Sequence, residues 1–262
     1  MCVAIYIPPK GNITRDRLFE CYTANPDGFG LMWSTDNELR IHKEVSDFER
    51  FYTYFLILYK TGRNFVVHFR TASSGSISDE NCHPFLVNNC LGFVENGNLY
   101  EFTNYFYRQR FDGQTDIMRF CQDILQCLPH NFLHRSDIRN ALEQYCISNY
   151  TKMVFMENTG HVEIINETSG EWVDGCWYSN GGIKNYTGYG YSGAYEYKSD
   201  DCKHKGGMIS QWLFPAGRRS NWFKCRECNG WFDNGHLVFR PKLGKIVCNN
   251  CKIYLDLKVY CQ

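Results

Sequence analysis

The sequence predicts an α+β protein with one large layered domain and a small C-terminal module. Short runs rich in Val, Ile and aromatic residues alternate with helical patterns, in mixed order, up to about residue 180. Beyond residue 216 the chain carries two Cys-x-x-Cys pairs, at 225–228 and 248–251. The mixed order favours sheets and helices stacked in layers, and the cysteine pairs indicate a unit with its own means of stabilisation.

Eight segments have the length and composition of strands. Each is short, rich in β-branched or aromatic residues, and bounded by turn residues. They cover residues 2–7, 29–34, 39–43, 64–69, 90–95, 152–156, 162–165 and 172–179.

Three further segments have helical periodicity. Ser46 and Glu49 have capping-box spacing and precede apolar residues at helical intervals from 51 to 59. Thr115 precedes the clearest apolar stripe, which runs from residue 117 to 128. A third helix is predicted from Ser136 to about Asn149.

Composition divides the chain into three parts. Residues 181–217 are rich in Gly and Tyr and lack periodicity, which is typical of a connector between a domain at 1–180 and a module at 218–262. Residues 216–262 hold nine Lys or Arg and three acidic residues, a net charge of +6, whereas the first 215 residues have a net charge of −6. Opposite signs in the two halves favour two modules.

Length and composition exclude several classes of protein. A chain of 262 residues that is 44% hydrophobic can bury a substantial core, which argues against global disorder. No apolar run approaches the ~18 residues of a membrane span, so no membrane partner is expected. The short apolar opening ends at Pro8-Pro9, has no basic stretch before it, and is typical of a buried strand. The fourteen cysteines are therefore expected to be mostly thiols in a reducing, cytoplasmic compartment.

The second residue is a cysteine, and its chemistry changes once Met1 is removed. A small residue at this position permits methionine excision, which would leave a thiol and a free α-amine on Cys2. Such an amine titrates near ~8 and can accept the thiol proton, so one residue would supply both nucleophile and base. The alternative is a cysteine that packs at the start of a strand.

Three internal stretches follow Cys2 in an order that is rarer than any of them alone: residues 68–75 (HFRTASSG), 79–85 (DENCHPF) and 92–99 (GFVENGNL). Together they resemble the glutaminase domain of class II glutamine amidotransferases, which are N-terminal-nucleophile hydrolases. Residues 25–30 (NPDGFG) and Thr115-Asp116 fall where that family has its glycine-containing turn and its Ser/Thr-Asp element. Residues 152–155 and 177–180 are similar to the closing strands of compact phage and bacterial members. The resemblance covers residues 2–180 and implies a four-layer αββα sandwich.

The resemblance also implies a role for each matching residue. Cys2 would attack the side-chain amide of glutamine, and Asn96 with the Gly97 backbone N–H would form the oxyanion hole. Arg70 would hold the substrate α-carboxylate through a bidentate contact, and Asp116 would pair with the α-ammonium. Taken singly, these residues have ordinary structural alternatives: an ion pair for Arg70, a charge at a helix N-terminus for Asp116, and a hairpin turn for Asn96-Gly97.

Two departures from the family pattern concern the same site. Glu95 stands where the family usually has a histidine, and a carboxylate there would disfavour an oxyanion unless it is turned away, paired or protonated. Ser73 and Ser74 replace the commoner Thr-His pair, so contacts to the substrate carboxylate are expected to differ. Either glutamine or a related amide is the expected substrate.

The cysteine pairs of the C-terminal module predict a zinc ribbon. Cys225, Cys228, Cys248 and Cys251 can supply four thiolates from two tight turns, which is the tetrahedral arrangement of a structural site with no open position. One zinc ion per chain is expected to contribute folding free energy to a module with a small core. A redox Cys-x-x-Cys motif is the alternative.

The sequence does not decide whether the predicted ribbon binds nucleic acid or another protein. Its basic residues, interleaved with Trp and Phe, suit contact with nucleic acid, and the same composition suits docking to a protein.

Two functions from different classes fit the whole sequence. The first is a glutaminase-type amidohydrolase that supplies ammonia to a separate acceptor enzyme, because no phosphate-cradling loop or second catalytic domain is recognisable. Analogy with the phage-type members suggests nucleotide or nucleic-acid modification. The second is a catalytically weak binding protein that retains the fold and recognises partners through its zinc ribbon.

Overall fold

The structure is a computed structural model that describes residues 2–72, 75–97, 99, 114–180 and four short strands between 222 and 248. The chain divides into two compact units, one of Met1–Ile183 with Asp256–Gln262 and the other of Lys184–Leu255. The first unit contains all the described helices and both large sheets.

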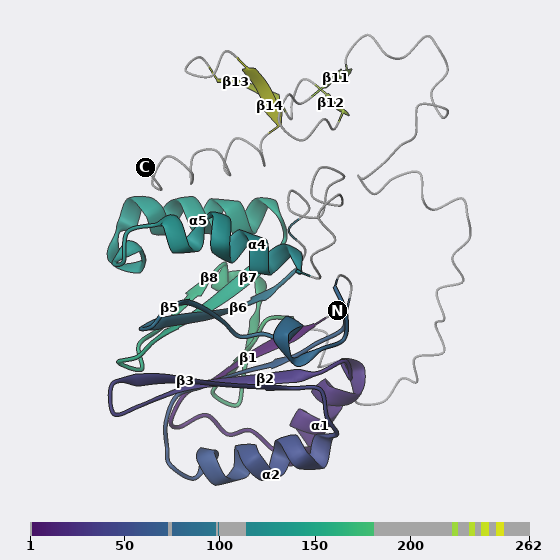
Figure 1. Cartoon of the computed structure of the whole chain (residues 1–262), viewed down its shortest axis with the longest axis vertical. Coiled ribbons are helices and arrows are strands. Elements are labelled where there is room, and N and C mark those ends of the chain that lie inside the picture. The colour runs from purple at the N-terminus through teal and green to yellow at the C-terminus, as the bar shows by residue number, and fades with distance from the viewer. Residues whose placement is uncertain are drawn as a thin grey trace, which may run out of the picture. The chain divides into compact units, whose positions relative to one another are not determined.

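Two antiparallel sheets form the centre of the first unit (Figure 1). The larger has the order β3-β2-β4-β1-β10-β9, and the smaller has the order β5-β6-β7-β8. The strands of the larger sheet are β1 (Val3–Ile7), β2 (Phe29–Thr35), β3 (Glu38–Glu44), β4 (Phe65–Phe69), β9 (Glu171–Val173) and β10 (Cys176–Tyr178). Those of the smaller sheet are β5 (Phe85–Asn88), β6 (Leu91–Asn96), β7 (Lys152–Glu157) and β8 (Val162–Ile165).

In the part of the chain that the structure describes, four α-helices cover the outer faces of the sheets. Helices α1 (Arg15–Ala24) and α2 (Phe48–Tyr59) lie on the larger sheet, and α4 (Asp116–Asp123) and α5 (Ser136–Ser148) lie on the smaller one (Figure 1). Short 3₁₀ turns are η1 (Asp79–Asn81), η2 (Leu125–Cys127), η3 (Phe132–His134) and η4 (Glu167–Ser169). The predicted four-layer αββα sandwich is therefore confirmed for this unit. Among the described residues, no helix is long and apolar enough to cross a bilayer.

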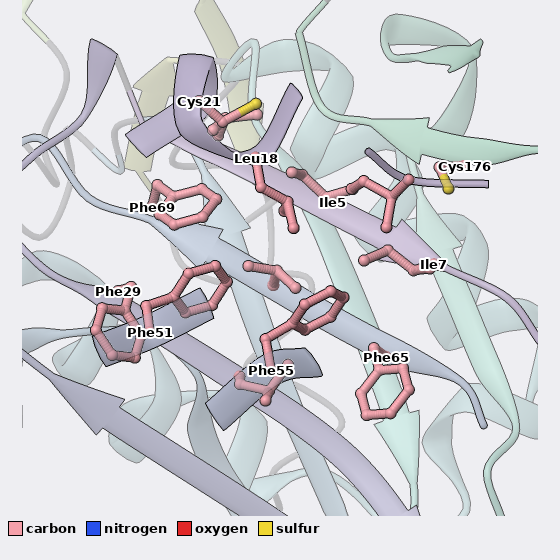
Figure 2. Packing of buried hydrophobic residues seen from close by; sticks show 14 of the residues in the cluster. Ile5, Ile7, Leu18, Cys21, Phe29, Phe51, Phe55, Phe65, Phe69 and Cys176 are labelled. Atoms are coloured by element: carbon pink, nitrogen blue, oxygen red, sulfur yellow. The ribbon is translucent and has the colours of Figure 1, made fainter. Parts of the chain in front are cut away.

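The central strands of the larger sheet are apolar on both faces because each face packs against another layer. In β1, Val3, Ile5 and Ile7 join the cluster beneath α1 and α2, whereas Ala4 points into the cluster between the two sheets. This alternation follows from the two-residue period of a strand. Figure 2 shows the helix-side cluster, in which rings from α2 lie with rings from β2 and β4, and Ile5 lies beside Leu18. Each buried Phe stabilises the fold by roughly 1.5–3 kcal/mol.

Several boundaries differ from the sequence prediction. The segment 172–179 is a hairpin, because Asp174 and Gly175 both have positive φ and turn the chain between β9 and β10. The N-cap of α2 is Asp47, whose side chain accepts the Arg50 N–H. The predicted stripe at 117–128 ends as an α-helix at Asp123 and continues as η2. Helix α1 and strand β5 are additional elements.

The second unit is described through two hairpins. One pairs β11 (Trp222–Lys224) with β12 (Trp231–Asp233), and the other pairs β13 (Leu237–Arg240) with β14 (Lys245–Cys248). The buried Val247 lies in β14. Of the predicted zinc ligands, Cys248 is the last residue of β14, and Cys225, Cys228 and Cys251 lie outside the described residues.

Candidate active site

An open pocket of about 330 Å³, measured with the solvent at its mouth, collects residues from distant parts of the first unit. Four of the residues predicted from sequence line it: Cys2, Arg70, Gly97 and Asp116. The other lining residues are Thr71, Asn81, His83, Glu95, Thr115 and Ile117.

Pairing of β1 with β4 brings Cys2 close to Arg70. The strands are antiparallel with Val3 opposite Phe69, so the residue before β1 and the residue after β4 meet at the same end of the sheet. The Cys2 sulfur lies 3.3 Å from the Thr71 backbone nitrogen and 3.4 Å from the Thr71 carbonyl oxygen. Burial is the main cause that raises the pKa of the Cys2 thiol, and Glu95, when it is ionised, adds to the rise. The resting sulfur is therefore a thiol, which needs a base before it can attack.

Asn96 ends β6 and is connected to β1 by a single hydroxyl group. Its side-chain nitrogen donates to Ser179 Oγ at 2.5 Å, and the same oxygen accepts the Ala4 N–H at 2.9 Å. The next residue, Asn180, donates from its side chain to the Cys2 carbonyl oxygen at 2.9 Å. Because an amide nitrogen carries two hydrogens, Asn96 has a second N–H with which to donate. The end of β10 thus fixes the amide and the sulfur relative to each other.

Arg70 is a buried cation whose guanidinium has a backbone carbonyl as a hydrogen-bond acceptor. Its Nη1 donates to the Ser76 carbonyl at 2.9 Å, and only 4% of the residue is exposed. Its own backbone N–H donates to the Gly28 carbonyl at 2.8 Å, and its carbonyl accepts the Asp27 N–H at 2.9 Å. The turn at 25–28 therefore fixes the position of Arg70 in the chain.

The segment after Arg70 is tied to the same turn. Thr71 donates from its hydroxyl to Asn25 Oδ1 at 2.8 Å, and Asp27 accepts the Ala72 N–H at 2.8 Å. The predicted substrate-binding residues Ser73 and Ser74 follow directly and lie outside the described residues.

Asp116 is the first residue of α4 and faces the pocket. Thr115 caps the helix by accepting the Met118 N–H, as a threonine before a helical stripe predicts. Asp116 Oδ2 accepts the Leu99 N–H at 3.1 Å. Asp116 and Arg70 both line the pocket, which therefore has one acidic and one basic side chain in its lining.

Two glycines of β2 and its preceding turn allow the 82–84 segment to reach the pocket. A Cβ at Gly28 would lie 2.4 Å from the Cys82 sulfur, and one at Gly30 would lie 1.6 Å from the His83 carbonyl oxygen. The segment therefore lies directly against the β2 backbone, and His83 stacks on His68 with ring centroids 4.3 Å apart. Burial lowers the pKa of His68 to about 3 and that of His83 well below its ordinary value. Both rings are neutral.

The sequence did not identify three residues that shape this site. Thr151 donates from its hydroxyl to Glu95, Ser179 connects Asn96 to β1, and His83 Nδ1 accepts the Glu95 N–H at 3.2 Å. These contacts join residues 12 to 83 positions apart. The stretches at 79–85 and 177–180 contain His83 and Ser179, whereas no sequence pattern indicated Thr151.

Metal binding was predicted for the C-terminal module and not for this pocket. Within the described residues, no group of three or more His, Cys, Asp or Glu side chains could hold a metal ion. Three of the four predicted zinc ligands are not among those residues.

Comparison with known proteins identifies a family for most of this unit. The family model of class-II glutamine amidotransferases matches residues 19–163. A structure of a glutamine aminotransferase class-II domain protein from Silicibacter pomeroyi is 16% identical, with a TM-score of 0.30, and the match covers 60% of this chain and 73% of that one.

A second solved structure is the glutamine phosphoribosylpyrophosphate amidotransferase of B. subtilis in complex with ADP and GMP. It is 19% identical, with a TM-score of 0.42, and the match covers 68% of this chain and 41% of that one. The shared region thus spans less than half of the B. subtilis enzyme. No curated protein matches the sequence.

Proposed function

Because the chain belongs to the class-II glutamine amidotransferases, we propose that it hydrolyses glutamine, or a related amide, with Cys2 as the nucleophile. The observation that carries the proposal is that Cys2, Arg70, Gly97 and Asp116, from four separate parts of the sequence, line one pocket. Removal of Met1 would make Cys2 the first residue of the mature chain.

The proposed reaction has two stages. The α-amine of Cys2 takes the thiol proton, and the sulfur attacks the amide carbon to form a tetrahedral oxyanion. The free N–H of Asn96 and the backbone N–H of Gly97 stabilise that oxyanion, and each such donor contributes roughly 3 kcal/mol in the transition state. The amide nitrogen takes the proton and leaves as ammonia. Water then attacks the thioester, which releases glutamate and restores the thiol.

The charges of the pocket suit an amino-acid head group. The guanidinium of Arg70 would pair with an α-carboxylate through two parallel hydrogen bonds, a geometry that lysine lacks. Asp116 would pair with the α-ammonium. Ser73 and Ser74 follow the Arg70 segment and would add hydroxyl donors to the carboxylate side.

The ammonia would serve a separate acceptor enzyme, a role that fits the pairing of glutamine hydrolysis with ammonia transfer in this family. Nucleotides or nucleic acids are the acceptors that we propose, with the basic C-terminal module as the element that would contact them. A cytoplasmic location fits both the thiol nucleophile and this role.

We expect the mature protein to release ammonia from L-glutamine, and mass spectrometry of the native chain to show Met1 removed. Nα-acetyl-glutamine is the matched control substrate, because it keeps the reacting amide and lacks the ammonium that Asp116 would bind. Its kcat/KM should be lower by at least roughly tenfold, because the contact with Asp116 is a hydrogen bond to a charged group that this substrate cannot form. A chain that fully retains Met1, or equal rates on both substrates, would contradict the mechanism.

We further propose that Cys225, Cys228, Cys248 and Cys251 hold one structural zinc ion. Support comes from the donor set, since four thiolates at this spacing suit a closed tetrahedral site. Zinc would hold the module together by linking the two turns that carry the cysteine pairs.

Chelation is expected to release about one zinc ion per chain and to expose residues 218–262 to proteolysis while sparing the first domain. Metal analysis gives the stoichiometry, and limited proteolysis with mass spectrometry locates the change. Cys248→Ser should reproduce the effect, whereas Cys90→Ser, at an exposed thiol of the first unit, should not. A metal-free chain with an equally resistant C-terminal module would exclude the zinc site.

A further inference from the structure

One wall of the pocket is formed by an acidic side chain that no step of the proposed reaction uses. Glu95 lies in β6, is 5% exposed and reaches the pocket. Its Oε1 accepts a hydrogen bond from the hydroxyl group of Thr151, a fully buried residue directly before β7. Asn96 pairs with Lys152 at the end of the β6–β7 ladder. The contact between Glu95 and Thr151 therefore lies where β6 ends and the chain enters the pocket lining.

The Glu95–Thr151 contact occupies the space beside Gly97. A Cβ at position 97 would lie 2.4 Å from Thr151 Oγ1 and 2.8 Å from Glu95 Oε1. Thr151 Oγ1 also lies 3.2 Å from the Asn96 carbonyl oxygen. The two side chains therefore pack directly against the peptide groups that would stabilise the oxyanion.

Thr151 itself is fixed by its backbone. Its N–H donates to the Cys146 carbonyl at 3.0 Å, and its carbonyl accepts the side chain of Asn166 at 2.8 Å. Asn166 is in turn held by its N–H, which donates to Glu143 Oε2 at 2.6 Å. The hydroxyl that meets Glu95 thus has a rigid support formed by α5 and the end of β8.

We propose that Glu95 is a positioning residue for the reaction: as an uncharged carboxylic acid bonded to Thr151, it holds the Asn96–Gly97 turn in the geometry that receives the oxyanion. The inference rests on the proposed function, and it adds a residue that the sequence alone marked only as a departure from the family pattern.

The surroundings of Glu95 favour its neutral form. Burial, and next the negative charge of Asp116, raise the pKa of Glu95 to about 8, although the Thr151 hydroxyl and the charge of Lys152 lower it. Other ionisable groups that line this pocket or pack around Glu95 are Cys2, Arg70, His68, His83 and Cys146. The two histidines are neutral, and burial keeps Cys146 a thiol.

Protonation of Glu95 also sets the charge of the pocket. With Glu95 neutral, Arg70 and Asp116 leave one positive and one negative charge, which match a zwitterionic head group. Ionised Glu95 would add a negative charge beside the developing oxyanion and would raise the pKa of the Cys2 thiol. Since an acid is neutral below its pKa, ionisation of Glu95 should lower activity as the pH rises through about 8. This fall opposes the rise that deprotonation of the Cys2 α-amine gives near ~8, so the two together form a limb on each side of an optimum.

The test is the pH profile of kcat/KM for glutamine in wild type and in Glu95→Gln. Glutamine at position 95 keeps an acceptor for Thr151 and cannot ionise, so the fall near pH 8 should disappear from its normalised profile. Glu38→Gln makes the same chemical change on an exposed strand residue outside the pocket and should keep the wild-type fall. An alkaline limb that is identical in wild type and Glu95→Gln would overturn the proposal.

Variants at Thr151 distinguish an effect on the position of the Asn96–Gly97 turn from an effect on the stability of the fold. Thr151→Val should lower kcat roughly tenfold to hundredfold with KM changed less than about threefold, because a displaced oxyanion donor affects the transition state most. Thr151→Ser retains the hydroxyl and should restore kcat. Rates are expressed per folded molecule by titrating the reactive Cys2 thiol. Equal kcat in Thr151→Val and wild type would contradict the role of the pair.

A second readout does not depend on glutamine. Alkylation of Cys2 by iodoacetamide, followed by peptide mass spectrometry against pH, should reach its half-maximal rate at lower pH in Glu95→Gln than in wild type. If wild type releases no ammonia but this shift is present, the proposed function fails and the charge effect of Glu95 on the pocket stands. If the two alkylation profiles coincide, the inference about Glu95 fails whatever the substrate.

Discussion

Replacing Cys2 by alanine is expected to reduce ammonia release from glutamine by at least about 10³-fold, the scale on which removal of a covalent nucleophile acts. The pocket would keep its charged side chains, because Arg70 bonds the Ser76 carbonyl and Asp116 bonds the Leu99 N–H, and neither contact involves the sulfur. Binding of glutamine should therefore survive the substitution while turnover is lost. Ammonia detection gives the rate, and isothermal titration gives the affinity.

The matched control is Cys90→Ala, which removes an exposed thiol in the turn between β5 and β6. It should keep wild-type turnover, since Cys90 lies outside the pocket lining. Equal ammonia release by Cys2→Ala and wild type would show that hydrolysis occurs elsewhere. A wild type that binds glutamine without hydrolysing it would favour the binding protein that the sequence left as the alternative.

The substitution Gly30→Ala is expected to destabilise the first unit by at least about 3 kcal/mol, at or above the upper end of ordinary overpacking. The added Cβ would lie 1.6 Å from the His83 carbonyl oxygen, a backbone atom that cannot rotate away. Relief requires the 82–84 segment to move off β2, and His83 lines the pocket. Denaturant unfolding should show the loss, and Cys2 alkylation should change with it.

Gly62→Ala provides a control in which the same methyl group meets no neighbour. Gly62 has a φ of +67° and nothing within 4 Å of its added Cβ, so the cost is the conformational one of ~1–2 kcal/mol. The difference between the two variants isolates the contact with His83. If Gly30→Ala were no less stable than Gly62→Ala, the close approach of this segment to β2 would be wrong.

Sequence patterns predicted the elements whose residues face a packed layer. The central strands appear as apolar runs because both faces are buried, and Thr115 marks the start of α4 through its side-chain cap. Helix α1 escaped prediction because it buries only Leu18 and Cys21, which leaves little periodicity to detect. Strand β5 is four residues long and follows Pro84, so its signal is that of a turn.

The residues of the candidate site also fall into two groups: those that sequence motifs identified and those that depend on contacts in the folded chain. Motif order identified Cys2, Arg70, Gly97 and Asp116, which the fold gathers around one pocket. The sequence also marked Glu95 as unusual, but its protonation depends on burial and on Asp116, which no local pattern shows. Ser179 and Thr151 act through contacts between strands that are distant in sequence. Such residues become visible only when the sheets are assembled.

The Ser179 hydroxyl joins residues that are synthesised at very different times, which affects when the site can form during translation. Strand β1 precedes the other described strands in the chain, yet one of its neighbours in the sheet is β10, and the oxygen that joins Ala4 to Asn96 belongs to the residue after β10. Contacts over such separations form late in folding. A nascent chain can therefore complete the hydrogen bonds around Cys2 and Asn96 only after residue 180 has been translated, so the geometry of the proposed site is acquired late in synthesis.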